Sequence, residues 1–257
     1  MPFLNHRKLY FLLKILFSHL PVIVLRKSKK IYPIKSGLNK LIMNVFCDNI
    51  VAQNYDQFYE SEKGRAVDQI EKSIVRELLH TIPFRGDMLE LGCGTGHWTK
   101  FFCDERFQVT AIDTSEAMLS EAQKKNIGCA TFLRADAAAL PFVDESFSVV
   151  ASITMLEFVE DIHKIFNETD RVLKRDGYLL FGWLNALSEL GKKKNSDKIY
   201  RHARFYTPDE IRQYLSYFGV PIMQFGVYYS PSFVLLDGTD KQNAVHLAFI
   251  ATLVQKK

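Results

Sequence analysis

Three glycines stand in the spacing G-x-G-x-G at positions 92, 94 and 96, directly after the short and largely apolar run 88–91. Glycine tolerates positive φ and has no side chain to hold a ligand away from the backbone. A strand that ends in such a loop and leads into a helix presents free N–H groups at the mouth of a parallel sheet. The loop is therefore predicted to bind a ligand through its backbone.

Two acids follow the next two strand-like runs. Asp113 ends the run 108–112 and lies 23 residues after Glu90, which is the length of one β-α-β unit. A carboxylate at the tip of a second strand can accept hydrogen bonds from both hydroxyls of a ribose. Asp136 follows the run 131–134 in the same way. Both acids are predicted to face the glycine loop at one edge of a sheet.

The other helices and strands of the chain must hold the glycine loop and the two acids in place. Apolar residues from Val67 to Leu79 recur at helical spacing and predict an amphipathic helix that covers the sheet. Helices are also expected from His97 to Glu105, after Ser115, and from Ile162 to Leu173, where Asp161 is a potential N-cap. The further expected segments are a fourth strand at 147–153, a turn at 174–177, a fifth strand at 178–181, and last strands near 222–229 and 245–254, joined by a turn around Asp237 and Gly238.

The order acid-x-G-x-G-x-G from Glu90 to Gly96 resembles the first motif of class I S-adenosylmethionine (SAM)-dependent methyltransferases. The pattern I-D-x-S-x-x-M-L at 112–119 and the tail Leu140-Pro141-Phe142 are similar to the type 11 methyltransferase family. The resemblance covers residues 50–182 and, less fully, 203–254. It implies a Rossmann-like α/β fold: a doubly wound, seven-stranded, mostly parallel sheet with a C-terminal antiparallel hairpin. It also implies SAM as the cofactor.

The resemblance assigns a set of residues to the cofactor. Asp113 would hold the ribose, Asp136 would accept from the adenine amino group with the Ala137 N–H near the ring, and Tyr55, with Phe58, would pack on the sulfonium. The implied cofactor-binding residues are Tyr55, Glu90, Gly92, Cys93, Gly94, Gly96, Asp113, Thr114, Met118, Asp136, Ala137 and Thr154.

Methyl transfer from SAM expels a neutral thioether, so the reaction needs no acid, and the sequence offers no evident acid–base pair. Should the acceptor have to lose a proton, the candidate bases are Glu157, His202 and Tyr206; each has a structural role as its alternative. The segment 154–159 contains no proline. Methyltransferases of base amines or glutamine amides carry Asn/Asp-Pro-Pro-aromatic there, which argues against those acceptors.

The expected function is methyl transfer from SAM to a small-molecule or lipid-like acceptor by in-line displacement. An insertion at about 184–206, ending in Arg204-Phe205-Tyr206, is expected to set acceptor choice. One alternative is a SAM- or nucleotide-binding sensor or scaffold without turnover. The other is an NAD-dependent oxidoreductase, which would require G-x-G-x-x-G.

Residues 1–42 differ in composition from the methyltransferase-like domain at 43–257. They hold nine Lys or Arg and no Asp or Glu, which leaves 24 basic and 29 acidic residues in the rest of the chain. No nucleic-acid partner is therefore expected. The extension is a membrane-surface anchor through residues 1–30, a poor signal peptide or span, or a spurious extension before a start at Met43. A cytoplasmic protein is expected, membrane-associated where the extension is real.

The four cysteines form no C-x-x-C pair and have no histidine at zinc-ligand spacing. The sequence therefore predicts free, buried thiols in a reducing compartment and no metal site.

Overall fold

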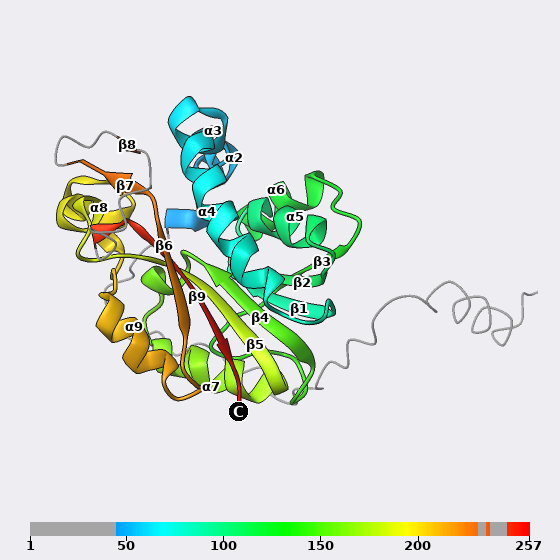
Figure 1. Cartoon of the computed structure of the whole chain (residues 1–257). Coiled ribbons are helices and arrows are strands. Elements are labelled where there is room, and N and C mark those ends of the chain that lie inside the picture. The colour runs from blue at the N-terminus through cyan, green and yellow to red at the C-terminus, as the bar shows by residue number, and fades with distance from the viewer. Residues whose placement is uncertain (1–44, 231–234, 237–245) are drawn as a thin grey trace, which may run out of the picture.

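The computed structural model describes residues 45–230, 235–236 and 246–257, and a seven-stranded sheet forms its centre (Figure 1). The strand order is β3-β2-β1-β4-β5-β9-β6. The pairs β1–β2, β2–β3, β1–β4 and β4–β5 are parallel, whereas β9 is antiparallel to both β5 and β6. The strands are β1 (Asp87–Leu91), β2 (Gln108–Asp113), β3 (Ala130–Arg134), β4 (Phe147–Ile153), β5 (Leu173–Leu184), β6 (Ile222–Gly226) and β9 (Phe249–Gln255). The predicted fold class is confirmed.

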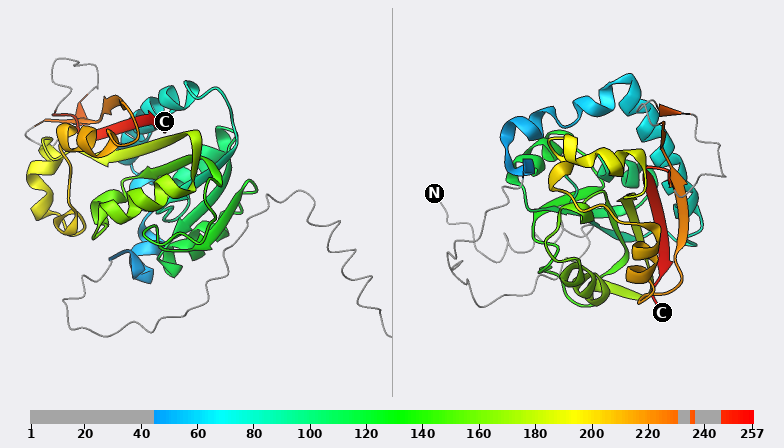
Figure 2. Two further views of the ribbon diagram at one scale, coloured as in Figure 1. Left: turned by 90° about the horizontal axis from the view of Figure 1, so that it is seen from below. Right: turned by 90° about the vertical axis from the view of Figure 1, so that its left-hand side faces the viewer.

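Helices cover both faces of this sheet (Figures 1 and 2). On one face, α4, α5 and α6 bury Val75, Phe102 and Leu119 in a cluster with Met88 of β1. On the other face, α7 and α9 bury their apolar side chains against β1, β4 and β5. The helices are α2 (Asn49–Asn54), α3 (Gln57–Glu60), α4 (Glu62–His80), α5 (His97–Asp104), α6 (Glu116–Lys124), α7 (Ile162–Val172), α8 (Glu189–Lys193) and α9 (Pro208–Leu215).

Short elements complete the described chain. A two-stranded sheet of β7 (Tyr228–Tyr229) and β8 (Leu235–Leu236) stands apart from the main sheet. The 3-10 helices are η1 (Val45–Cys47), η2 (Leu156–Phe158), η3 (Lys194–Ser196) and η4 (Tyr200–His202).

The predicted N-cap Asp161 is present, and side chains also cap the N-termini of α6 and α9. The Ser115 hydroxyl accepts from the Met118 N–H at 3.2 Å, and Asp161 accepts from the His163 N–H at 3.0 Å. Thr207 and Glu210 form a reciprocal capping box, with Pro208 at the first position of α9. A side-chain cap of this kind contributes about 1 kcal/mol to stability.

The predicted turn at residues 174–177 is wrong, because β5 is one long strand that runs through it. Phe147 pairs with Leu173 and Val149 pairs with Tyr178, so four residues of β5 bulge out of the ladder. Asp176 at the bulge has φ 59°. The turn-like Asp-Gly pair therefore produces a bulge inside a strand rather than the start of a new one.

The last strands also differ from the prediction. The strand expected at 222–229 is divided into β6 and β7, because Val227 has φ 62°, outside the extended region. The strand expected at 245–254 begins at Phe249 and ends at Gln255. The antiparallel partners are β6 and β9, and the turn expected at 237–238 lies outside the described residues.

The prediction of four free cysteines is wrong for one pair. Cys103 at the end of α5 and Cys129 before β3 form a disulfide, with their Cα atoms 5.9 Å apart. Cys47 and Cys93 are free; Cys93 is buried as predicted, whereas Cys47 is exposed. The two joined residues are 26 positions apart, and only the packing of α5 beside β3 brings them together.

The expectations for residues 1–42 lie outside the described residues. Within the part of the chain that the structure describes, no helix combines the length and apolarity needed to cross a bilayer.

Candidate functional site

The glycine loop joins β1 to α5, and its backbone shape depends on glycine. Gly92, Gly94 and Gly96 have φ of 69°, 52° and 79°, which side chains rarely allow. A Cβ on Gly92 would collide with the side chain of Met155. A Cβ on Gly94 would meet no atom within 4 Å, since this glycine faces open space. The loop therefore brings bare backbone to the edge of a cavity.

Asp113, at the tip of β2, is tied to this loop. Its carboxylate accepts from the Gly94 N–H at 2.9 Å and from the Ser115 N–H at 2.8 Å. Burial raises the pKa of Asp113, while these backbone N–H groups act in the opposite direction. The adjacent strand tips are thus held at a fixed distance by one carboxylate.

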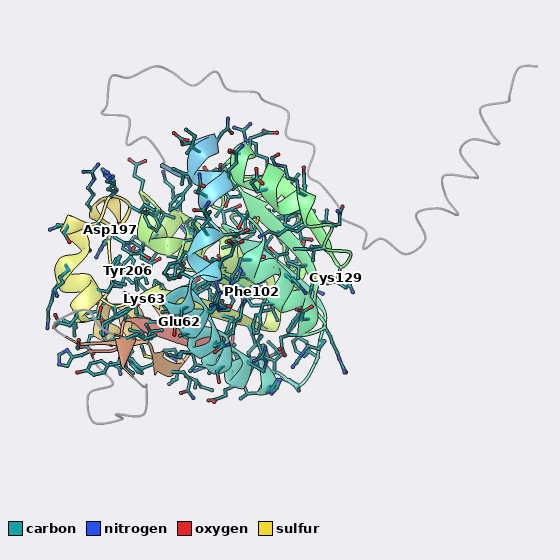
Figure 3. The ribbon with its side chains drawn as sticks, turned by 90° about the horizontal axis from the view of Figure 1, so that it is seen from above. Glu62, Lys63, Phe102, Cys129, Asp197 and Tyr206 are labelled. Carbon is teal, nitrogen blue, oxygen red and sulfur yellow. A yellow bond between two sulfur atoms is a disulfide. The ribbon has the colours of Figure 1, made fainter. Side chains whose placement is uncertain are left out.

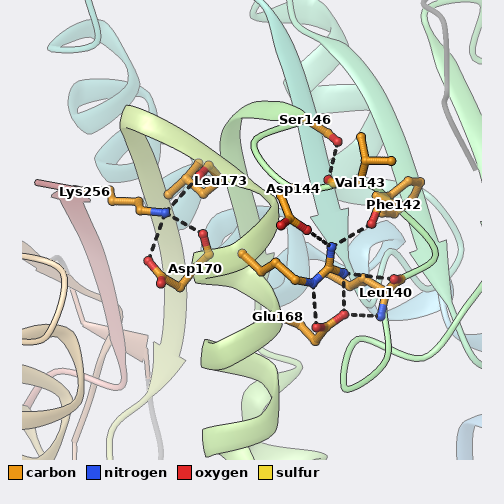
Figure 4. Close-up of polar contacts among 10 residues, drawn as sticks. Leu140, Phe142, Val143, Asp144, Ser146, Glu168, Asp170, Leu173 and Lys256 are labelled. Carbon is orange, nitrogen blue, oxygen red and sulfur yellow. Dashed lines mark hydrogen bonds and ion pairs between the residues drawn. The ribbon is translucent and has the colours of Figure 1, made fainter. Parts of the chain in front are cut away.

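Asp136 lies on the loop after β3, which α7 holds in place. Asp136 accepts from the Ala138 N–H at 2.9 Å. Farther along the loop, Arg171 of α7 donates to the carbonyls of Leu140 and Phe142, at 3.1 and 2.7 Å (Figure 4). Glu168 pairs with Arg171 at 2.7 Å and accepts from the Leu140 N–H. The loop is therefore fixed by a charged network rather than by strand pairing.

These tips surround a cavity of about 350 Å³. It opens at the carboxyl ends of β1, β2, β3 and β4, where the strand order reverses between β1 and β4. Such a switch point is the usual ligand site of open α/β sheets. The structure brings nine of the twelve expected cofactor residues to this cavity: Tyr55, Gly92, Gly94, Asp113, Thr114, Met118, Asp136, Ala137 and Thr154.

The other three expected residues lie behind the loop, outside the lining of this cavity. Glu90 is buried and accepts from the Thr99 hydroxyl of α5 at 2.5 Å; burial raises its pKa to about 8. Burial also raises the pKa of the Cys93 thiol. Gly96 donates its N–H to the Cys93 carbonyl at 2.9 Å and is the N-cap of α5. These three residues therefore support the conformation of the glycine loop and do not line the cavity.

A second cavity of about 900 Å³ adjoins the first. Its walls come from α2 to α4, from residues 184–200, and from the chain around Val227 and Phe249. Its lining is mainly aromatic and aliphatic. Four residues line both cavities: Phe46, Tyr55, Thr154 and Phe158. The two cavities therefore share a wall.

The N-terminal helices are fastened to the glycine loop. Asp56 accepts from the Thr95 hydroxyl at 2.6 Å and forms an ion pair with Lys125 at 2.6 Å. The Ser115 hydroxyl donates to the Phe46 carbonyl at 2.7 Å. The wall that carries Phe46 and Tyr55 is thereby anchored to the elements that hold the first cavity.

The three candidate bases lie outside the lining of both cavities. Glu157 is buried, accepts from the Leu184 N–H at 2.6 Å, and has a pKa raised by burial to about 8. The Tyr206 hydroxyl donates to the Leu156 carbonyl at 3.3 Å, and burial raises its pKa to about 12. His202 is exposed and accepts from Arg201. No group of three or more His, Cys, Asp or Glu residues suited to a metal ion occurs among the described residues.

The residues of the larger cavity that sequence reasoning missed include Phe46 and Glu71. Glu71 lies four residues after Val67 and four before Val75, which are both buried. A charged residue within an apolar helical stripe is a recognisable signal, because it must face something other than bulk water. For Phe46 the sequence contains no comparable signal.

The comparisons with known proteins agree with this geometry. The family model of the methyltransferase domain matches residues 89–181. An uncharacterized protein of Methanocaldococcus jannaschii is 34% identical over 181 residues, which cover 69% of this chain and 81% of that protein. The malonyl-[acyl-carrier protein] O-methyltransferase of Hamiltonella defensa is 31% identical over 129 residues, which cover 49% of this chain and 50% of that protein.

A solved SAM-dependent methyltransferase of Thermotoga maritima, described as a possible histamine N-methyltransferase, shares the fold. Its TM-score is 0.63 at 23% identity, and the match covers 82% of this chain and 99% of that one. Fold, glycine loop and strand-tip acids thus define a class I methyltransferase. The chain belongs to the methyltransferase domain family of type 11, and it is an enzyme whose cofactor is SAM.

Proposed function

We propose that this enzyme transfers the methyl group of SAM to a small organic acceptor bound in the 900 Å³ cavity. The observation that carries the proposal is the wall shared by the two cavities, formed by Phe46, Tyr55, Thr154 and Phe158. A donor in the first cavity and an acceptor in the second would meet at this wall.

The residues around the first cavity fit the cofactor. Gly94 leaves its backbone bare on the cavity side, and Asp113 and Asp136 face the cavity with carboxylates suited to ribose and adenine. We assign Asp113 to the ribose, Asp136 and Ala137 to the adenine, and the glycine loop to the methionine part. Tyr55, on the shared wall, is assigned to the side of the sulfonium.

When bound, SAM supplies an activated methyl group with a neutral thioether as its leaving group. The protein's task is then alignment, which is worth roughly 7–11 kcal/mol in well-oriented reactions. Phe46, Tyr55 and Phe158 supply apolar surface that excludes water from the junction of the cavities. The chain's residues thus bind, orient and desolvate rather than act as acid or base.

The lining of the larger cavity supports an acceptor with an apolar body. Leu190, Ile199 and Tyr200, from the expected insertion at 184–206, form part of it. We infer that this insertion selects the acceptor. The names of two similar proteins, a malonyl-[acyl-carrier protein] O-methyltransferase and a possible histamine N-methyltransferase, also support acceptors other than nucleic acids.

Titration calorimetry with S-adenosylhomocysteine, the demethylated product, tests the assignment of Asp113. The native protein should bind it and should not bind NAD, and Asp113→Ala should lose most of the affinity. Undiminished binding by Asp113→Ala would refute the assigned role.

Labelled-methyl transfer into a cell extract, followed by mass identification of the product, tests turnover. A labelled small molecule supports the proposal. Labelled nucleic acid as the only product would overturn the acceptor class, and no labelled product across broad metabolite pools would favour a sensor.

A further inference from the structure

Glu71 of α4 lines the larger cavity and has no hydrogen-bond or ion-pair partner among the described residues. It is partly buried, and it is enclosed enough that burial raises its pKa to about 8. Asp68 adds to this rise, while Lys72 acts against it. Burying a carboxyl without a partner is costly. The Glu71 carboxyl is therefore suited to pair with a ligand that enters the cavity.

Four tyrosines lie around this carboxyl. Burial raises the pKa values of Tyr55 and Tyr229 to about 12, and the negative charge of Glu71 contributes to both shifts. The pKa values of Tyr59 and Tyr200 are raised for the same two reasons. All four rings line the larger cavity. An acid among aromatic rings is the environment in which a cation is stabilised.

Other charged residues of the lining have partners of their own. Asp197 accepts from the Ile199 and Tyr200 N–H groups, at 2.7 and 2.9 Å. Lys194 donates to the Ala203 carbonyl at 2.8 Å. Lys63, which is labelled in Figure 3, has its Nζ 4.7 Å from the centroid of the Tyr229 ring. Asp197 is thus committed to capping a turn, which leaves Glu71 as the acid available to a ligand within the described lining.

We propose that the acceptor carries a basic nitrogen and that Glu71 recognises it. The ligand class is a small amine with an apolar or aromatic body. The ammonium group pairs with the Glu71 carboxylate, and the body packs against the aromatic lining. This inference rests on the proposed function, because it assumes that the larger cavity is the acceptor site. It concerns binding only, and Glu71 is a recognition residue rather than a catalytic one.

The test compares 2-phenylethylamine with 2-phenylethanol, two probes of similar shape of which only the first is a cation. Each is titrated into the full-length protein saturated with S-adenosylhomocysteine at pH 8.5. The variants are Glu71→Gln and, as a matched control on the exposed side of the same helix, Glu77→Gln. Denaturation curves establish that each variant is folded.

The native protein and Glu77→Gln should bind the amine about tenfold or more tightly than the alcohol, which is the usual scale for a buried charge-assisted pair. Glu71→Gln should lose this preference and keep its affinity for S-adenosylhomocysteine. Equal binding of both probes by the native protein, or an unchanged preference in Glu71→Gln, would overturn the recognition role. Failure to bind S-adenosylhomocysteine would instead count against the proposed function.

Discussion

Replacing Gly94 by alanine should separate folding from cofactor binding. Gly94 has φ 52°, and its hypothetical Cβ meets no atom of the protein within 4 Å. The only cost to folding is therefore the left-handed backbone, about 1–2 kcal/mol. For a chain of this size, that corresponds to a melting temperature lower by roughly 2–8 °C. The variant should remain folded, since domains are typically stable by about 5–15 kcal/mol.

The new methyl group occupies the space into which the bare loop faces. It should push a bound ligand away from the backbone, and we expect the affinity for S-adenosylhomocysteine to fall at least tenfold, or about 1.4 kcal/mol. Calorimetry measures this affinity, and thermal denaturation without ligand measures the folding cost. Gly128→Ala is the control, because its Cβ would also meet no atom and its φ is not in the left-handed region.

If Gly94→Ala shows the expected loss of stability but binds S-adenosylhomocysteine as tightly as the native protein, the predicted role of Gly94 in cofactor binding is refuted. Such a result would mean that the ligand does not approach this part of the loop. An equal loss of affinity in Gly128→Ala would show that the effect is not local.

Three further outcomes are expected. Arg171→Met should lower stability by about 1–3 kcal/mol and weaken S-adenosylhomocysteine binding in calorimetry, because the loop that carries Asp136 loses its donors. Reduction of the Cys103–Cys129 disulfide should cost roughly 3–4 kcal/mol in denaturant unfolding, from the loop that it closes. The affinity for 2-phenylethylamine should rise between pH 6.5 and 8.5, because Glu71, with a pKa of about 8 in the free protein, must lose its proton to pair with a cation.

Each outcome has a control. Arg175→Met removes an exposed arginine of β5 and should change neither stability nor binding appreciably. The stability of Cys103→Ser should not change on addition of reductant. A loss of stability in this variant would mean that reductant acts on something other than the Cys103–Cys129 disulfide.

The pH profile should flatten in Glu71→Gln. The groups that face Glu71 are Asp68, Lys72 and the four tyrosines, whose raised pKa values keep the tyrosines neutral in this range. His97 contacts Asp68 and Lys72. A pH dependence of the affinity that persists in Glu71→Gln would contradict the proposal.

The first cavity could be anticipated because its residues are set by local rules. Parallel strands end at one edge, so Asp113 at the end of β2 and Asp136 just after β3 must lie near the loop that follows β1. Glycines with positive φ are likewise a local requirement. These features follow from spacing along the chain. Tyr55 is the exception among the nine residues, because contacts such as that of Asp56 with Thr95 bring its segment to the cavity.

The larger cavity could not be anticipated in the same way. Its walls come from α4, the insertion and the last strands, which only the complete fold brings together. The Cys103–Cys129 pair and the bulge at Asp176 depend in the same way on contacts between distant segments. Glu71 is the intermediate case, because the helical stripe marks it as unusual and only the fold shows what it faces.

The shared wall has a thermodynamic consequence. Because Phe46, Tyr55, Thr154 and Phe158 border both cavities, any shift of these side chains that one ligand induces alters the surface offered to the other. Linkage requires the effect to be mutual: the factor by which the donor changes acceptor affinity equals the factor by which the acceptor changes donor affinity. In the proposed arrangement, with SAM in the first cavity and the acceptor in the second, binding of one reactant therefore changes the affinity for the other.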